Sequence, residues 1–132
     1  MSDVEKVRGF LTDLELEITA FDQEQELFKV SNEDKGVVDM LIDCEGDTVV
    51  IEQCIMPMPK EVDARVAFSE KLLTWNRDLI HGAFALTESD FVVYRDTLKL
   101  KTLDFVELQG SVEALGLGLA EKRTEILAFT GS

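Results

Sequence analysis

The stretch "VVDMLIDCEGDTVVIEQCIM", residues 37–56, decides the fold. Two runs rich in β-branched residues flank a glycine, which is the pattern of a β-hairpin. We place its two-residue turn at Glu45 and Gly46, so that Asp43 faces Thr48. Prolines end the second strand, because proline has no N–H to donate to a neighbouring strand.

This register gives the hairpin two different faces. One face is almost entirely apolar and is expected to face the core: Val38, Met40, Ile42, Val49 and Ile51, together with Gln53. The apolar members of the other face are Val37, Leu41, Val50, Cys54 and Met56. Acidic residues interrupt this second face, and Asp39 is expected directly across from Glu52, where like charges are unfavourable.

The second face is too apolar to meet only solvent and too acidic to be core. Such a face commonly marks a place where another chain docks. Methionine side chains nearby add deformable apolar surface. The candidate protein-binding residues are therefore Val37, Leu41, Val50, Cys54, Met56 and Met58. The alternative is that the first or the last helix covers this face within the monomer.

Helices are expected on both sides of the hairpin. The first begins with "SDVE", a capping-box pattern, and continues with one apolar helical face: Val4, Val7, Leu11, Leu14 and Ile18. Residues 60–80 carry two apolar stripes, which predicts a helix that is covered on more than one side and ends at Gly82. The first stripe is Phe68, Leu72, Trp75 and Leu79, and the second is Val62, Val66, Leu73 and Ile80.

The remaining strands come in neighbouring runs. A strand is expected at 27–30, a turn at 31–36 and a second hairpin at 83–87 and 91–95. The element order is then α-β-β-β-α-β-β-α. Strands joined by short turns are antiparallel, so the fold class is α+β, an antiparallel sheet covered by helices on at least one face. A single domain of residues 1–132 fits this length.

The last helix opens with Asp104 as its N-cap, and Glu107 completes a capping box. Gly110, Gly116 and Gly118 fall inside this helix, where glycine is unfavourable. The helix therefore either packs very closely against a neighbour there or is interrupted near the second and third glycines.

The charge balance excludes several classes of partner. The 13 Lys and Arg against 27 Asp and Glu give a net charge of -14. Contacts with phosphate need a basic surface, so binding to nucleic acid or to anionic lipid is not expected, whereas basic partners are favoured. No charged-then-apolar leader, membrane-length apolar run or CxxC motif is present in the sequence, so we expect a cytoplasmic protein with free thiols.

Residues that could do chemistry do not form a catalytic set. An enzyme or small-ligand site could be built around Asp78, His81 and Tyr94, but it would need a pocket that joins them. The preferred interpretation of His81 is a helix C-terminus, where an imidazolium meets the helix dipole favourably. Trp75 is expected in the core, and Asn76 is expected to bind the backbone of the following loop.

Metal and cofactor motifs are missing as well. The acidic cluster at 43–47 has its glycine at position four, whereas a calcium loop has it at position six. A single histidine cannot build a His-based zinc site. Cys44 and Cys54 have no basic neighbour in the sequence that would activate their thiols, so both are expected to be inert apolar side chains. No catalytic residue, metal or cofactor is expected.

From the second helix onward, the chain resembles the type III secretion chaperone-like fold. The resemblance rests on a helix that ends in leucines and an asparagine (Leu72, Leu73, Asn76), a hairpin, and an acidic amphipathic last helix. That fold includes the Tir-type secretion chaperones and the YbjN-like proteins, and "FVVYRDTLKLKTLDFVEL" is most similar to the small YjfI-like bacterial family. The resemblance implies a non-enzymatic cytoplasmic protein, often a homodimer, that binds another protein through apolar patches.

Three functions stay open at this point. The first is a protein-binding module, possibly chaperone-like, with a partner of unknown identity. The second is a small-ligand binder or enzyme around Asp78, His81 and Tyr94. The third is a structural subunit whose apolar face is buried by self-association in a homodimer.

Overall fold

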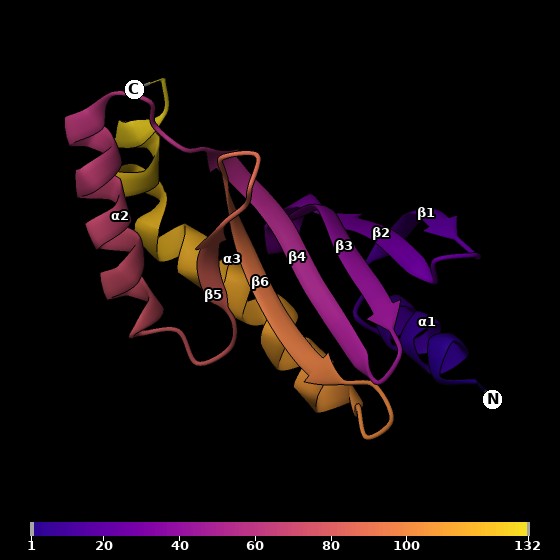
Figure 1. Cartoon of the computed structure of the whole chain (residues 1–132). Helices are drawn as coiled ribbons and strands as arrows, with labels where there is room; N and C mark the ends of the chain where they lie inside the picture. Colours follow the sequence, from indigo (N-terminus) through magenta and orange to yellow (C-terminus); the bar gives the residue numbers. More distant parts are fainter. Residues whose placement is uncertain (1, 132) are drawn as a thin grey trace.

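The computed structural model describes residues 2–131 and shows a six-stranded antiparallel sheet. The strand order is β1-β2-β3-β4-β6-β5, so β6 lies between β4 and β5. The helices α1 and α3 lie behind the sheet, and α2 stands beside β5 at one end (Figure 1). The elements are α1 (Asp3–Asp13), β1 (Glu17–Asp22), β2 (Leu27–Asn32), the short helix η1 (Glu33–Lys35), β3 (Val37–Glu45), β4 (Thr48–Pro57), α2 (Val62–Asn76), β5 (Ala83–Leu86), β6 (Phe91–Lys99) and α3 (Phe105–Phe129).

This arrangement confirms the α+β class, the antiparallel sheet and the expected order of elements, with β1 as an additional strand. The helix α1 begins as predicted, because the Glu5 N–H donates to Ser2 Oγ at 3.1 Å. It ends at Asp13, however, and Glu15 takes a left-handed φ of 61° that an α-helix does not contain. The expected extension of the first helix to Ile18 is therefore wrong.

The hairpin of β3 and β4 turns one residue later than expected. Glu45 pairs with Thr48, so Gly46 and Asp47 form the two-residue turn. Gly46 takes a φ of 58°, which glycine adopts without strain. Each residue of β3 consequently faces a residue two positions further along β4 than predicted, and the pairing of like charges across the hairpin does not occur.

Two β-bulges change which side chains face the helices. On β3 the bulge lies at Asp39, which has a φ of 50° and donates its N–H to Ser31 Oγ at 2.9 Å. On β4 the bulge lies at Ile55. Because a bulge inserts one unpaired residue, it reverses the alternation of side chains beyond it. Val37 and Met56 therefore point to the helix-covered side of the sheet and not to the opposite side.

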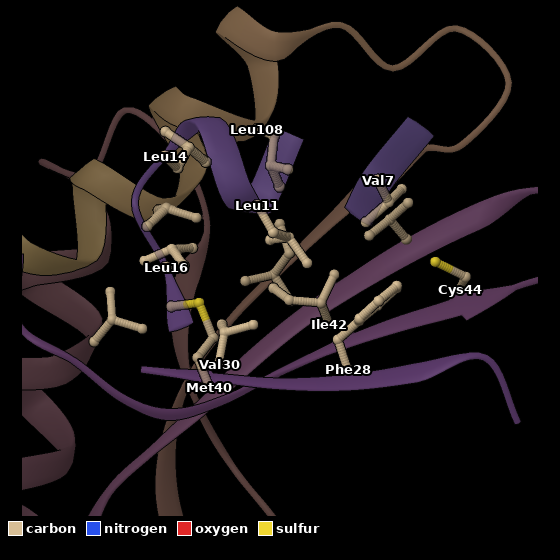
Figure 2. Packing of buried hydrophobic residues seen from close by; sticks show 14 of the residues in the cluster. Val7, Leu11, Leu14, Leu16, Phe28, Val30, Met40, Ile42, Cys44 and Leu108 are labelled. Atoms are coloured by element: carbon tan, nitrogen blue, oxygen red, sulfur yellow. The ribbon is translucent and has the colours of Figure 1, made fainter. Parts of the chain in front are cut away.

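Two apolar cores lie on the covered side. The larger one packs α1 and the first half of α3 onto the sheet (Figure 2), with Val7, Leu11, Phe28, Met40, Ile42, Ile51, Tyr94 and Leu108 among its buried members. The smaller one joins α2, the second half of α3 and the β5 end of the sheet. Its buried members are Met56, Met58, Phe68, Trp75, Phe84, Val92 and Ile126. The expected core position of Trp75 is confirmed.

The helix α3 is continuous and closely packed. Its predicted capping box is confirmed, since the Glu107 N–H donates to Asp104 Oδ1 at 2.8 Å and the Asp104 N–H donates to Glu107 Oε1 at 3.2 Å. A Cβ on Gly116 would lie 2.5 Å from the Lys35 carbonyl oxygen. The glycine is therefore required by the close approach of α3 to η1, and the interrupted-helix alternative is wrong.

The helix α2 is shorter than predicted and covered on one side only. It ends at Asn76, whereas Gly82 lies just before β5 with a φ of 69°. Val62 and Leu73 are 70% and 72% exposed, and Val66 is exposed beside them. The expectation that both stripes are covered is wrong for the monomer. We term the three exposed residues the α2 face.

Candidate protein-binding surface

Within residues 2–131, no helix covers the face of the sheet that points away from α1 and α3 (Figure 1). We term it the open face. Its apolar side chains come from neighbouring strands: Leu27 on β2, Leu41 on β3, Val50 and Cys54 on β4, and Phe91 and Val93 on β6. These residues belong to neither of the two cores. Val50 and Val93 are nevertheless buried, at 9% and 4% exposure, whereas Leu27 and Leu41 are half-buried and Cys54 and Phe91 are exposed. The four accessible side chains leave apolar surface that the monomer does not cover.

A small cavity of about 120 Å³ opens on this face. Leu27, Leu41 and Val50 supply its apolar lining. Its charged lining is Asp43, Glu45, Glu52 and Arg95. The Glu52 carboxylate pairs with the Arg95 guanidinium at 3.0 Å across β4 and β6. An apolar depression is thus bordered by three carboxylates and one guanidinium.

The carboxylates of this cavity crowd one another. The pKa of Asp43 is raised to about 6, mainly because burial disfavours its charged form. A hydrogen bond with Glu45 and the negative charge of Glu45 raise it further, while Arg95 acts in the opposite direction. A basic group brought onto this surface would relieve that crowding, so the open face favours a binder with basic residues.

The six candidate residues fall into two groups. Three lie on the open face: Leu41, Val50 and Cys54. The other three are buried on the covered side: Val37, Met56 and Met58. The prediction that Val37 and Met56 share a face with Leu41, Val50 and Cys54 is wrong, because the two β-bulges reverse the side-chain direction at the ends of both strands. Within the first group, Leu41 and Cys54 are accessible to a partner, whereas Val50 is only 9% exposed.

Phe91 and Val93 complete the open face and were missed from the sequence. Val93 pairs with Cys54 on β4, which places the two side chains next to each other. The signal was present in "FVVYR", because side chains alternate along a strand and a core Tyr94 requires its neighbour to point the other way.

Asn76 joins α2 to β5 as predicted. Its Nδ2 donates to the Phe84 carbonyl oxygen at 3.0 Å, and the Phe84 N–H donates to its Oδ1 at 2.6 Å. The side chain thereby satisfies both backbone groups of Phe84 that point away from β6. The Trp75 ring lies 6.0 Å from the Phe84 ring, edge to face, and adds apolar contact at the same joint.

Asp78, His81 and Tyr94 do not converge on a cavity. The Tyr94 hydroxyl is buried and donates to the Ser111 carbonyl oxygen at 2.7 Å, and burial raises its pKa to about 12. The His81 ring packs against α3, where a Cβ on Gly110 would lie 2.8 Å from Nε2. Because α2 ends before His81, the helix-cap interpretation of this residue is wrong. Asp78 is exposed, and none of the three residues lines the small cavity of the open face or the larger cavity between η1 and α3.

The part of the chain that the structure describes contains no group of three or more His, Cys, Asp and Glu side chains placed to hold a metal ion. Among the helices formed by residues 2–131, none is both long enough and apolar enough to cross a bilayer. Cys44 is buried and Cys54 is exposed, and both thiols are free. Burial raises the pKa of the Cys44 thiol to about 11.

The family model CesT_Tir_1 matches residues 1–132. The chain belongs to the CesT_Tir_1 family. This confirms the resemblance to the Tir-type, YbjN-like fold that the second half of the sequence carries. No curated protein sequence matches this CesT_Tir_1 member.

Solved structures share the fold of this CesT_Tir_1 member at low sequence identity. YbjN from E. coli is 15% identical, with 92% of each chain covered and a TM-score of 0.67. The HopA1–SchA chaperone–effector complex contains a chain that is 14% identical, with 98% of this chain and 94% of that chain covered and a TM-score of 0.59. The structure of the Yersinia pestis type III secretion chaperone SycH, in complex with a stable fragment of YscM2, is 11% identical. The match covers 98% of this chain and 100% of that chain, with a TM-score of 0.53.

Proposed function

We propose that this protein is a non-enzymatic, chaperone-like module of the cytoplasm that holds a partner polypeptide on the open face of its sheet. The observation that carries the proposal is a row of accessible apolar side chains on four neighbouring strands that belongs to neither core: Leu27, Leu41, Cys54 and Phe91. A contiguous apolar surface outside the cores commonly marks a protein-binding site. Membership of the CesT_Tir_1 family and likeness in fold to a chain of a chaperone–effector complex support this proposal.

The chemistry of the open face defines the partner. Apolar side chains of the partner would cover Leu41, Cys54 and Phe91, while its basic side chains would meet the carboxylates of Asp43 and Glu52. The net charge of -14 favours a basic partner over the whole surface and speeds its association.

The test compares two substitutions by glutamine, one on the open face and one at a control position. L41Q removes apolar surface from the open face, whereas V106Q changes a 69% exposed residue on α3 that is far from it in the sequence. A partner is recovered from the host cytosol with the wild-type protein, identified and purified, and its affinity is measured by calorimetry. L41Q should weaken binding by about tenfold, and V106Q should leave it unchanged. Equal affinity of L41Q and wild type, with both folded, would remove the open face from the proposal.

Self-association is a second candidate role, and the α2 face supports it. Val62, Val66 and Leu73 form an exposed apolar stripe on one side of α2. A symmetric dimer would bury the same stripe from both copies. Sedimentation velocity at micromolar concentration should then give a dimer for the wild type and a monomer for L73Q. A wild-type protein that stays monomeric under these conditions would exclude the dimer.

A further inference from the structure

A second cavity, larger than the one on the open face, lies on the opposite side of the sheet. It has a volume of about 730 Å³ and runs between η1 and α3. Its lining contains Leu14 at the end of α1, the η1 turn and one side of α3. Along α3 the lining extends from Val112 to Leu127, which corresponds to about 22 Å of helix. We term it the α3 groove.

The lining of the groove is mainly apolar, and the monomer leaves two of its leucines uncovered. Leu117 is 67% exposed and Leu127 is 53% exposed. Ala120 lies between them in the sequence, is exposed and contributes little side-chain bulk, so a binder can approach the α3 backbone closely there. Because these two leucines are exposed, they contribute little to the stability of the monomer. They are suited to contact an apolar stripe of about four helical turns, the length of the groove.

The walls of the groove determine the secondary structure of its occupant. No strand residue lines it, and the backbone of α3 from Val112 to Leu127 lies within one continuous helix. A strand laid in the groove would therefore find no unpaired sheet edge, and its own N–H and C=O groups would lose water without gaining partners. A helix satisfies its own backbone and can pack side by side with α3 at the usual helix spacing.

The charges around the groove determine the polarity of that helix. Glu33, Asp34 and Glu113 lie at the end nearest η1, and Arg123 lies further along α3. Lys35 also lines the groove, but its ammonium group already donates a hydrogen bond to the Leu14 carbonyl oxygen at 2.8 Å. Basic residues at one end of an incoming helix would therefore meet three carboxylates.

We infer that the α3 groove binds an amphipathic helix of a partner protein, with an apolar stripe of about four turns and basic residues facing Glu33, Asp34 and Glu113. This inference rests on the proposed protein-binding function and assigns a second contact to it, on the face opposite the sheet surface. A second copy of this chain, packed through its own α3, is the competing occupant, and the oligomeric state of L117Q distinguishes it from a partner helix.

The experiment uses the full chain and a synthetic probe. The probe is an 18-residue peptide with capped ends whose leucines form one helical stripe and whose remaining positions are lysine. The controls are a peptide of the same composition in scrambled order and an analogue with glutamate in place of lysine. Binding is followed by calorimetry and by the helical circular dichroism that the peptide gains. The wild-type chain should bind the ordered lysine peptide at least about tenfold more tightly than either control.

Neutral substitutions locate the site. L117Q and L127Q should each weaken binding of the ordered peptide by about tenfold, because each removes one leucine from the buried contact. V106Q, at a residue of α3 with matched exposure that does not line the groove, should leave the affinity unchanged. Equal binding of the scrambled peptide, or no effect of L117Q and L127Q, would overturn the inference. Conversion of a wild-type dimer to a monomer by L117Q would overturn it in favour of a second copy as occupant.

The outcome is separable from that of the proposed function. If L41Q abolishes binding of the purified cytosolic partner while L117Q and L127Q bind both partner and peptide normally, the open-face proposal stands and the groove inference fails. If L117Q and L127Q lose the peptide and the partner while L41Q retains both, the groove inference stands and the open-face proposal fails.

Discussion

Replacing Asn76 by alanine should loosen the joint between α2 and β5. The side chain makes two hydrogen bonds to the Phe84 backbone, at 3.0 and 2.6 Å, and both are partly buried. Each such bond contributes about 1 kcal/mol net, and leaving a partly buried donor or acceptor unpaired costs roughly 1 kcal/mol more. We therefore expect N76A to lower the free energy of unfolding by about 2–4 kcal/mol.

Urea denaturation followed by tryptophan fluorescence measures this loss, because Trp75 lies at the same joint. T74A is the matched control: the Thr74 hydroxyl donates to the Glu70 carbonyl oxygen at 2.9 Å at an exposed site, and its removal should change stability by less than about 0.5 kcal/mol. A loss below about 0.5 kcal/mol for N76A, with an unchanged urea slope, would refute the view that these two bonds fasten β5 to α2.

Three other changes test the close packing and the buried polar groups. G116A should destabilise the fold by about 1–3 kcal/mol in thermal or urea melts, because its Cβ would lie 2.5 Å from the Lys35 carbonyl oxygen. The control G9A has nothing within 4 Å of its Cβ and should be neutral or stabilising, because alanine has the higher helix propensity. Y94F should cost about 1–2 kcal/mol in the same melts, because it leaves the buried Ser111 carbonyl without its 2.7 Å donor. D43N should be more stable than wild type at pH 7, and its stability should fall less between about pH 4 and pH 6. The pKa of the Asp43 carboxyl is about 6 in the folded protein and 3.8 ordinarily, so the folded state binds more protons in this range. The wild-type protein therefore loses stability as the pH rises through that window.

Local signals predicted the elements well. The capping box of Asp104 and Glu107 and the bonds of Asn76 depend on residues close in the chain, so their physics is visible in the sequence. The glycines inside α3 also gave a correct alternative, because a residue that weakens a helix usually allows close packing. The element order was predicted from the same kind of local pattern.

Side-chain alternation failed where the strands are irregular. Strict alternation from the turn placed Val37 and Met56 on the exposed face, but the bulges at Asp39 and Ile55 reverse their direction. A bulge is decided by the neighbouring strand and by the core that the strand must cover, which the hairpin sequence alone does not contain. The turn was predicted one residue too early because Gly46 fits either position of a two-residue turn.

Surfaces formed by segments that are distant in the sequence could not be predicted from local patterns either. The α3 groove joins the end of α1, η1 and α3, which are separated by up to about one hundred residues. The two stripes of α2 look equally apolar in the sequence, yet only the stripe with Phe68 is covered. Which stripe is left exposed depends on where α3 lies, so only the three-dimensional arrangement distinguishes a core stripe from the α2 face.

The most direct test of the central claim is an NMR titration of the methyl-labelled protein with its purified partner. Binding on the open face predicts that the methyl signals of Leu41, Val50 and Val93 shift in a saturable way, while those of Val106 on α3 stay in place. Shifts confined to α2 or α3, with the signals of Leu41 and Val50 unchanged at saturation, would contradict a partner-binding role for the open face of the sheet.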